Sequence, residues 1–535
     1  MANFRIDSAN RKLGIKKMVA IQKHSKHSSQ ESIWWTPPVP SWKPLKKTLN
    51  SSLRIACIVS DRLYQGLRFE GQVMLVTPQN WKKILTYGKP DFLLIESTEN
   101  TATEHWSNGQ NPSSSEWKQL LEIVSWGRQL SIPTVYWLTE DRIYHDRYKD
   151  FARYFDFVFC ADPQEVELLQ TEGIEAETLL PCIQPALYNP FRLYEYYGSL
   201  NLNILFDGWA DVDRIGEALS ILQEVKPYGL SIIESQNQVS SGNLESLAEY
   251  KDCILGYVTK QDRILALKYA KAYVTFEQTL SSRTTQQWMT LEAAATRLPV
   301  VHYGKLSDGD VRKGVVIECP DRMEFLVEFV RFREDNLYRE RVGHLGWRYV
   351  FQNHTFAHRI QKISQTIGVE HDWEEYPKVS LITPSYRRKL VSQSLETFEW
   401  QNYPNKEYIL VFNGQDMPSH KELGIDETRN DICIANVPRE LFAGACLNQG
   451  YIIASGKYCF RVDDDDDYGP NYILDMILHS RSIDSDLFGK PPVPVYFENS
   501  SDLYAKRHIK PLSIVNSILF QHGKTWIGGN TLSGK

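Results

Sequence analysis

The stretch Tyr458-Cys-Phe-Arg-Val-Asp-Asp-Asp-Asp-Asp-Tyr-Gly-Pro470 places five consecutive aspartates directly after a short apolar strand pattern. Two unit charges about 4 Å apart repel by roughly 1 kcal/mol in water and by about 4 kcal/mol at an effective dielectric constant of 20. A run of this kind is therefore costly unless a cation lies beside it. If the strand stays extended into the run, its side chains alternate between two faces. Asp463 and Asp465 then share one face and can converge on one hard divalent ion.

The acidic run is also compatible with two structures that need no such site. A solvated loop is the usual state of a run of like charges. A calcium loop of the EF-hand kind is a further alternative, because Asp463, Asp465 and Asp467 have the right first spacings. However, Tyr468 stands where that loop requires glycine, and Leu474 stands where it requires a bidentate glutamate. We therefore reject the EF-hand, and the motifs around the run favour a metal site over a solvated loop.

The composition excludes one broad class of partner. The chain has 535 residues, 42% of them hydrophobic and 24% charged, which is typical of a globular protein with about three domains. Its net charge of −6 gives no basic domain of the kind that binds nucleic acids. A small molecule or a glycan is therefore the expected partner.

Cysteine and apolar patterns bear on the compartment. The eight cysteines are scattered without a C-x-x-C pair, so we expect reduced, mostly buried thiols in a cytoplasmic protein. No apolar run approaches the roughly 18 residues of a membrane span, and the start of the chain lacks a signal-peptide core. We expect neither a transmembrane segment nor secretion.

Residues 1–50 differ in composition from the rest of the chain. They are rich in Lys, Arg, His and Ser and contain Trp34, Trp35 and Trp42. This composition predicts a disordered tail or linker. A peripheral contact with an anionic membrane surface, at the inner face of the membrane, is the alternative.

From residue 51, short β-rich runs alternate with amphipathic helical segments, a pattern typical of parallel sheets covered on both faces. The strands of the two series are expected at Arg54–Val59, Phe92–Ile95, Thr134–Leu138 and Phe155–Phe159, and at Asn203–Phe206, Leu230–Ile233, Ala272–Phe276, Val300–Val301 and Val315–Ile317. The helices are expected at Ser115–Val124, Pro163–Leu169, Met323–Arg331 and 335–366. We predict two Rossmann-like halves, residues 51–195 and 196–370, with a cleft between them.

A third α/β unit is predicted over residues 376–535. Its strands are expected at Val379–Ile382, Tyr408–Val411 and Tyr458–Val462, and its helices over residues 388–400 and 441–454. The motifs of this unit resemble the catalytic domain of family 2 glycosyltransferases, which have the nucleotide-binding GT-A fold. They are Val379-Ser-Leu-Ile-Thr-Pro-Ser-Tyr386, Ser394-Leu-Glu-Thr-Phe-Glu-Trp-Gln-Asn-Tyr-Pro-Asn-Lys-Glu407, Val411-Phe-Asn-Gly414, Gly444-Ala-Cys-Leu-Asn448, Ala454-Ser-Gly-Lys-Tyr458 and the D-x-D motif Asp463-x-Asp465-Asp466 with Pro470.

The resemblance implies a role for several residues. Those that would contact the donor are Thr383, Pro384, Tyr386, Asn413, Asn448 and Asp463. Asp463 and Asp465 would also bind the diphosphate through a Mn²⁺ or Mg²⁺ ion. Taken singly, these residues also suit purely structural roles, such as Pro384 ending a strand or Tyr386 packing in the core.

The end of the chain resembles the segment beside the acceptor site. The matching residues are Gly528, Gly529 and Asn530. In the family, an acidic residue that deprotonates the acceptor hydroxyl usually lies beyond this segment, whereas this sequence ends at Lys535. We therefore expect either a fragment of a longer protein or a base from elsewhere, and we assign no catalytic base.

The chemistry favours the same site independently of the resemblance. Breaking a sugar–diphosphate bond places negative charge on the departing phosphate, and an oxygen-ligated divalent ion can neutralise that charge. Carboxylates are suitable ligands for such an ion.

Residues 53–365 resemble a different group, the spore-maturation-protein-like glycosyltransferases of the GT-B fold. The matching stretches are Lys89-Pro-Asp-Phe-Leu-Leu-Ile-Glu96, Ile132-Pro-Thr-Val-Tyr-Trp-Leu-Thr-Glu-Asp141, Phe155-Asp-Phe-Val-Phe-Cys-Ala-Asp162, Asn189-Pro190, Ile254-Leu-Gly-Tyr257, Ser282-Arg-Thr284 and Leu291-Glu-Ala-Ala-Ala-Thr-Arg-Leu-Pro-Val-Val301.

Some positions of that group are altered in this chain. Trp288-Met289 replaces a pair of arginines suited to a diphosphate, and Arg297 replaces a glycine that allows close backbone approach to the nucleotide. Glu292 stays where the group commonly binds the ribose, although a glutamate that opens a helix is more often a dipole partner. We expect a reduced or non-catalytic first module.

The sequence thus predicts a bacterial, cytoplasmic glycosyltransferase of cell-surface polysaccharide biosynthesis that inverts the anomeric carbon. The donor would be a nucleotide sugar, of the UDP type in this family, and the acceptor a glycan, a lipid-linked molecule or a protein. Two alternatives stay open. One is a non-catalytic scaffold that binds nucleotide sugars or glycans, and the other is a metal-dependent nucleotidyltransferase.

Overall fold

The structure is a computed structural model that describes residues 52–106, 109–190, 202–207, 216–234, 250, 252–276, 283–426, 428–482, 487–490, 495–497, 502–504 and 517–521. The predicted tail, residues 1–50, lies outside the described residues. The chain divides into two compact units, Met1–Asp372 (unit 1) and Trp373–Lys535 (unit 2), and each is described by itself. The finer boundaries expected at 195/196 and 370/376 stay predictions.

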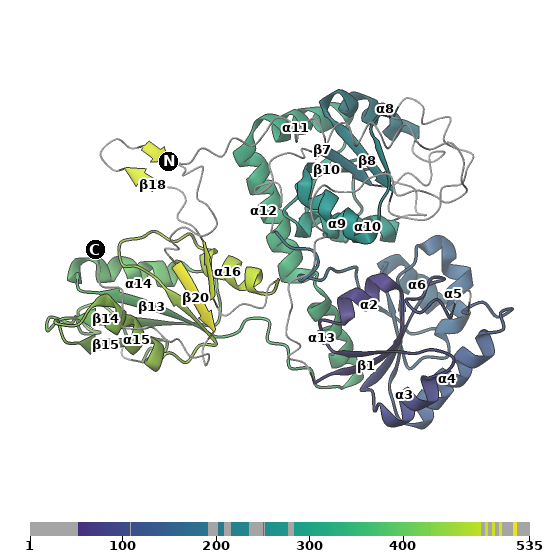
Figure 1. The fold of residues 1–535 in the computed structure, drawn as a ribbon, viewed down its shortest axis with the longest axis horizontal. Coiled ribbons are helices and arrows are strands. Elements are labelled where there is room, and N and C mark those ends of the chain that lie inside the picture. The colour runs from purple at the N-terminus through teal and green to yellow at the C-terminus, as the bar shows by residue number, and fades with distance from the viewer. Residues whose placement is uncertain are drawn as a thin grey trace, which may run out of the picture. The chain divides into compact units, whose positions relative to one another are not determined.

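The first sheet of unit 1 consists of six parallel strands in the order β2-β1-β3-β4-β5-β6 (Figure 1). The strands are β1 (Arg54–Ile58), β2 (Gln72–Leu75), β3 (Phe92–Glu96), β4 (Thr134–Leu138), β5 (Phe157–Cys160) and β6 (Glu177–Thr178). The helices between them are α2 (Asp61–Leu67), α3 (Trp81–Tyr87), α4 (Trp117–Gln129), η1 (Arg142–Tyr144), α5 (His145–Ala152) and α6 (Pro163–Thr171). The apolar runs of the sequence therefore form central strands.

Alternating side chains of these strands build two separate cores. Ala56 and Ile58 point toward one face, where they join residues of α3 to α6 such as Phe151. Ile55 and Cys57 point toward the other face and join α2 and residues far along the chain. Both faces of the sheet are buried, which explains why its strands read as continuous apolar runs rather than as alternating ones.

The second sheet of unit 1 also has six parallel strands, in the order β12-β11-β10-β7-β8-β9. They are β7 (Leu202–Asp207), β8 (Leu230–Glu234), β9 (Ile254–Tyr257), β10 (Ala270–Phe276), β11 (Val300–Tyr303) and β12 (Val316–Cys319). The helices are α8 (Gly216–Val225), η3 (Lys226–Tyr228), α9 (Lys260–Tyr269), α10 (Arg283–Ala295), η6 (Val311–Gly314), α11 (Arg322–Glu334), α12 (Asn336–Asn353) and α13 (Phe356–Ile367).

The last helix of unit 1 returns to the first sheet (Figure 1). Phe356, Ile360 and Ile363 of α13 share a buried cluster with Ile55 of β1. Arg359 of the same helix donates hydrogen bonds to main-chain carbonyls of residues 180 and 181 at 2.6 and 2.8 Å. The stretch expected as one long helix over residues 335–366 is therefore two helices, one on each half.

Unit 2 contains a sheet in the order β15-β14-β13-β16-β20-β17. The first four strands are parallel, and β20 pairs antiparallel with both β16 and β17. The strands are β13 (Val379–Ser385), β14 (Lys406–Asn413), β15 (Ile432–Val437), β16 (Tyr458–Arg461), β17 (Leu487–Lys490) and β20 (Ser517–Gln521), with a separate hairpin of β18 (Val495–Phe497) and β19 (Asp502–Tyr504). The helices are η7 (Arg388–Leu390), α14 (Val391–Trp400), α15 (Ala443–Ile453) and α16 (Tyr472–Ser480).

Helices α14 and α15 pack on the parallel strands of this sheet. Cys446 and Ala454 at α15 join Ile382, Ile409 and Val411 in one buried cluster. The helix lies so close to the sheet that a Cβ atom added at Gly450 would collide with the Ile382 side chain. Phe398 of α14 packs against Tyr408 of β14 with tilted rings, their centroids 5.5 Å apart.

The fold-class prediction is confirmed, with two Rossmann-like halves followed by a third, mostly parallel sheet. The alternative role for Pro384, ending its strand, is not observed, because β13 continues to Ser385 beside β14. The Ile382 carbonyl faces β16, where it accepts the Val462 N–H at 3.0 Å. Main-chain groups of residues two apart in a strand point toward the same neighbouring strand, so the N–H that proline lacks at position 384 would also face β16. The β16 ladder has ended at that level, so the proline breaks no hydrogen bond.

Two expected properties of the whole chain can be checked. All eight cysteines are free, and all but Cys433 are buried, as expected. Within the described residues, no helix is both long and apolar enough to cross a membrane.

The amino edge of the unit 2 sheet is held by Glu407. Its carboxylate accepts hydrogen bonds from the Ser380 hydroxyl at 2.6 Å and from the Ser455 N–H and hydroxyl, both at 2.7 Å. It also forms an ion pair with Lys378 at 2.7 Å. Burial by itself raises the pKa of Glu407, but Lys378 and the serine donors outweigh burial and lower the pKa to about 2.

Because the pKa of Glu407 is depressed in the folded state, its stabilisation is present above the ordinary pKa of 4.5 and is lost as the pH falls toward 2. We expect Glu407→Gln to destabilise unit 2 by about 2 kcal/mol at neutral pH and to flatten stability against pH between 4.5 and 2. Urea unfolding across this pH range measures both effects. The matched control Glu396→Gln, on an exposed position of α14, should change neither; equal behaviour of the two variants would contradict the assignment.

Candidate functional site

The candidate site lies at the carboxyl edge of the unit 2 sheet, between β13 and β16. Connections from β13 lead to β14 and then to β15 on one side, whereas β16 lies on the other side of β13. The strand order therefore reverses between these two neighbours. In open α/β sheets such a reversal leaves a crevice outside the strand ends, where ligands bind.

The acidic loop after β16 is anchored at both ends. Val462 donates to the Ile382 carbonyl, and the Asp463 N–H then donates to the Tyr468 hydroxyl at 3.1 Å instead of to a strand. At the far end, the carbonyls of Gly469 and Pro470 accept hydrogen bonds from the 401–402 turn at 3.0 and 2.7 Å. The loop is therefore tied to β13 at its start and to the turn after α14 at its end.

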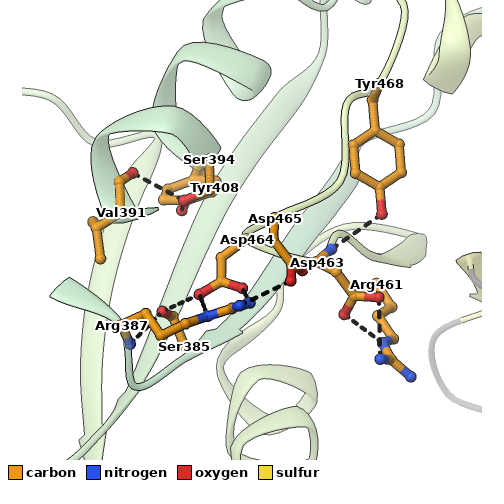
Figure 2. A network of polar contacts seen from close by, with 10 residues as sticks. All are labelled: Ser385, Arg387, Val391, Ser394, Tyr408, Arg461, Asp463, Asp464, Asp465 and Tyr468. Atoms are coloured by element: carbon orange, nitrogen blue, oxygen red, sulfur yellow. Dashed lines mark hydrogen bonds and ion pairs between the residues drawn. The ribbon is translucent and has the colours of Figure 1, made fainter. Parts of the chain in front are cut away.

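Arg387 forms the centre of the polar network at this edge (Figure 2). Its guanidinium donates to both carboxylate oxygens of Asp464, from Nε at 3.3 Å and from Nη2, and to Asp465 from Nη1 at 2.8 Å. The Ser385 hydroxyl donates to Asp464 and accepts the Arg387 N–H at 3.1 Å. Asp463 instead pairs with Arg461, at 2.9 Å from Nε.

The expected alternation of carboxylates along an extended strand is wrong. β16 ends at Arg461, and Asp464 and Asp465 lie in a turn. Asp464 is buried against Ser385, whereas the Asp465 side chain is 53% exposed. The physical reason is that two arginines and the Tyr468 hydroxyl supply partners that an extended strand would not reach.

The donor set of the loop fits a hard divalent cation in its chemistry, because Mg²⁺ and Mn²⁺ take carboxylate oxygens. Among the described residues, however, no three His, Cys, Asp or Glu side chains come together as a ready ligand set. Asp463 and Asp465 each face an arginine. A cation at these carboxylates would have to replace at least one guanidinium contact.

The residues expected at the donor side of β13 lie in different environments. Thr383 is fully buried, so its side chain packs within the sheet and does not line the surface. Pro384 is partly exposed at the strand end. Tyr386 is 72% exposed and Arg387 lies over its ring, with the guanidinium carbon 5.7 Å from the centroid. Of this group, Tyr386 offers a flat exposed face.

The two asparagines expected at the donor side also differ. Asn413 ends β14, and its amide donates to the carbonyls of Leu441 at 2.6 Å and Pro438 at 3.4 Å. It therefore braces the loop that leads into α15. Asn448 lies on α15 with an exposed side chain. Phe442, at the start of the same helix, is 87% exposed and was not expected.

Gly528, Gly529 and Asn530, expected beside the acceptor, lie outside the described residues. The sequence reasoning missed Ser385, Arg387 and Asp464, which form the network in Figure 2. A signal was available, because Arg387-Arg388 follows the predicted strand Val379–Ile382 within a few residues, at the same sheet edge as the acidic run. A basic pair beside an acidic run predicts an ion pair when both segments share an edge.

Glu292 of unit 1 does not open a helix, contrary to the expectation. α10 begins at Arg283, so Glu292 lies in its last two turns, fully buried. Its carboxylate forms a buried ion pair with Arg263, which also pairs with Asp207 at the end of β7. Arg62 of α2 approaches Glu292 from the first half at 3.6 Å. These cations already satisfy the carboxylate that the resemblance assigns to a ribose.

The N-terminus of α10 is filled by a carboxylate of the first half. Asp141 accepts hydrogen bonds from the N–H groups of Thr284 and Thr285 at 2.7 and 3.3 Å and from the Thr285 hydroxyl at 2.8 Å. Burial raises the pKa of Asp141 to about 6, although these hydrogen bonds oppose the rise. Helix N-termini attract anions such as phosphates, and here the protein supplies its own anion.

The altered positions of α10 have structural roles. Trp288 is buried, with its ring centroid 6.1 Å from that of Trp137 and the Arg62 guanidinium 5.5 Å above it. Met289 is buried as well. Arg297 follows the helix with φ of +62°, a left-handed conformation that favours glycine. The backbone thus keeps the geometry of the glycine that the resemblance expects.

Since a non-glycine residue in this conformation is strained by about 1 kcal/mol, Arg297→Gly should raise the free energy of unfolding of unit 1 by about that amount. The ion pair of Arg297 with Glu340 at 3.7 Å is near the surface and contributes little. Urea unfolding measures the change. Arg297→Ala is the control, because it loses the ion pair and keeps the strain; a glycine variant no more stable than the alanine variant would contradict the expectation.

Comparisons with known proteins give partial likenesses. No protein-family model matches the chain. The chain is similar to the putative colanic acid biosynthesis glycosyl transferase WcaA of Escherichia coli (strain K12), with 29% identity over 111 residues. These residues are 20% of this chain and 39% of the relative, so the chain spans well under half of that protein.

Two solved structures are similar to parts of the chain. HepE of Anabaena, in complex with UDP and glucose, is 11% identical and covers 59% of this chain and 99% of its own, with a TM-score of 0.40. The mannosyltransferase PcManGT of Pyrobaculum calidifontis, in complex with GDP-Man and Mn²⁺, is 20% identical and covers 19% of this chain and 32% of its own, with a TM-score of 0.17. Both TM-scores are low, so the fold description depends on the strand order alone.

Proposed function

We propose that unit 2 is an inverting glycosyltransferase that transfers a sugar from a nucleotide-sugar donor to a glycan, lipid-linked or protein acceptor. The observation that carries the proposal is the position of the acidic loop at the strand-order reversal, against the end of β13. The likeness to the E. coli glycosyl transferase supports it. A cytoplasmic location and a part in polysaccharide synthesis are predictions from the sequence.

Charged and aromatic groups at this edge suit a nucleotide diphosphate. The leaving diphosphate gains negative charge, and the partly exposed guanidinium of Arg387 is a bidentate donor for phosphate oxygens. The exposed ring of Tyr386 offers a stacking surface for the base, a uracil by the family resemblance. When bound, Mn²⁺ or Mg²⁺ at Asp463 and Asp465 would neutralise the diphosphate. The acceptor would approach from the side of Gly528, Gly529 and Asn530.

A single substitution tests the donor site. Asp465→Ala removes the most exposed carboxylate of the Arg387 pair, so we expect the Mn²⁺-dependent affinity for UDP to fall at least tenfold. Isothermal titration with UDP, with and without Mn²⁺, measures the loss. Asp426→Ala removes an exposed carboxylate elsewhere in unit 2 and serves as the charge-matched control. Unchanged Mn²⁺-dependent affinity in Asp465→Ala would remove this residue from the site.

The products separate this function from the nucleotidyltransferase alternative. A screen of nucleotide sugars with Mn²⁺ should release nucleoside diphosphate, because the sugar–phosphate bond breaks. A parallel reaction with a nucleoside triphosphate and a sugar 1-phosphate should give no pyrophosphate. Release of pyrophosphate in that reaction would identify a nucleotidyltransferase and overturn the proposal.

We further propose that unit 1 is a non-catalytic scaffold. The observation that favours this role is that its charged groups already have internal partners, with Asp141 on the N-terminus of α10 and Glu292 on Arg263. A donor diphosphate or ribose would have to displace both. Trp288 fills the interior where the resemblance expects an arginine.

If unit 1 is a scaffold, Asp141→Ala should act on stability and leave donor binding intact. We expect it to destabilise unit 1 by about 1–2 kcal/mol through loss of the helix cap, with Mn²⁺-dependent UDP affinity unchanged. Asp146→Ala, which removes a highly exposed carboxylate of α5, is the control and should do neither. Saturable UDP binding that persists in Asp465→Ala and disappears in Asp465→Ala/Glu292→Gln would instead show a donor site in unit 1.

A further inference from the structure

Arg387 has two acidic partners that differ in burial. Asp464 is almost completely buried and accepts from Ser385 as well as from two nitrogens of Arg387. Asp465 is half exposed, and Arg387 reaches its carboxylate through Nη1. A buried carboxylate is costly without a charged partner, whereas an exposed one is readily hydrated. The contact with Asp464 is therefore the permanent one, and the contact with Asp465 is the replaceable one.

A divalent cation and Arg387 compete for Asp465. Arg387 Nη1 donates to the Asp465 carboxylate at 2.8 Å, so the guanidinium already neutralises the group. An incoming ion must displace Nη1 and then lie close to a positive charge that Asp464 holds in place. Two positive charges that both lie beside the Asp465 carboxylate repel each other strongly outside bulk water. A metal ion without a counter-anion is therefore disfavoured at this carboxylate.

A diphosphate would remove this penalty. Its oxygens can bind the ion and the guanidinium at once, and the planar fork of arginine suits phosphate as well as carboxylate. Nε and Nη2 stay with Asp464, so Nη1, once released from Asp465, is free to donate to a phosphate oxygen. Binding of the metal and binding of the diphosphate then favour each other reciprocally.

We propose that Arg387 is an internal counter-ion that keeps Asp465 from binding a divalent cation until a nucleotide diphosphate arrives, and that it then contacts the diphosphate. The inference rests on the proposed donor site of unit 2 and adds an order of assembly to it. Arg387 is a positioning residue in the resting chain. It makes simultaneous binding of metal and donor the stable arrangement.

The neighbouring Arg388 provides a matched control. It has the same charge and adjoins Arg387 in sequence, but its guanidinium donates to Glu422 at 2.6 Å and to the Asp416 carbonyl at 3.1 Å. Neither partner belongs to the acidic loop. Substitution of Arg388 therefore changes the net charge of the unit equally without touching Asp465.

The test measures Mn²⁺ binding by the full-length chain through the electron paramagnetic resonance signal of free Mn²⁺, with and without UDP. We expect Arg387→Gln to bind Mn²⁺ alone at least tenfold more tightly than the unaltered chain, and the enhancement of Mn²⁺ affinity by UDP to shrink at least tenfold. Arg388→Gln should behave like the unaltered chain. Arg387→Lys keeps the charge and should bind Mn²⁺ alone as weakly as the unaltered chain does. Circular dichroism checks that each variant is folded.

The outcomes separate this inference from the donor site itself. If Arg387→Gln leaves Mn²⁺ affinity unchanged or lowers it while Asp465→Asn weakens Mn²⁺ binding in the presence of UDP, the counter-ion role is overturned and the donor site stands. If the tighter binding in Arg387→Gln survives in Arg387→Gln/Asp465→Asn, the ion lies elsewhere and the inference is overturned. If UDP never enhances Mn²⁺ binding in the unaltered chain, both proposals are overturned.

Discussion

The candidate site depends on the parallel pairing of β13 with β14 on one side and β16 on the other. This pairing brings three loops that are far apart in the sequence to one sheet edge, after Ser385, Asn413 and Arg461. The register is specific, because Ile382 lies beside Arg461 and Ser385 lies beside Phe412. A shift of one residue would turn Ser385 away from Asp464 and bury a different set of side chains.

Charge balance explains the shape of the acidic loop better than strand geometry does. Five neighbouring carboxylates cannot all be buried, and the chain buries Asp464 where Ser385 and Arg387 can satisfy it. Asp463 turns to Arg461. Burial and repulsion from Asp463 and Asp465 raise the pKa of Asp466, so the charge of the loop is only partly compensated. Part of the positive charge that the acidic run requires is therefore supplied by arginines of the protein itself.

Local patterns predicted the fold well and predicted contacts between distant residues poorly. Every strand expected from an apolar run is present, with bounds shifted by a few residues. The strands missed are β2, β6, β9, β15, β17, β18, β19 and β20. All of them lie at or next to sheet edges or in the two-stranded hairpin, where short runs carry less apolar signal. For Pro384, a strand-ending role stayed open as an alternative, because sequence alone does not show that its neighbour β16 ends first.

The same limit applies to the site residues. The D-x-D spacing drew attention to Asp463 and Asp465, yet Asp464 is the residue at the centre of the network. Its importance follows from Arg387, 77 positions earlier in the sequence. Glu292 was likewise expected at the start of a helix, whereas α10 begins at Arg283. The start of this helix depends on tertiary contacts that hydrophobic periodicity does not report.

In all three large sheets, the order of the parallel strands reverses once, and the groups at the reversal differ in their exposure to solvent. In the first sheet, Glu96 at the end of β3 accepts a hydrogen bond from the N–H of Ser60 after β1 at 2.6 Å, and the glutamate is buried. In the second, Asp207 and Arg263 form a pair that is buried as well. In unit 2, the ion pair at the reversal includes a half-exposed carboxylate, Asp465. A buried ion pair can change partners only by leaving a desolvated charge unpaired, whereas an exposed carboxylate can exchange its partner for a ligand. The topology therefore offers three equivalent places for a ligand, and solvent access favours the third.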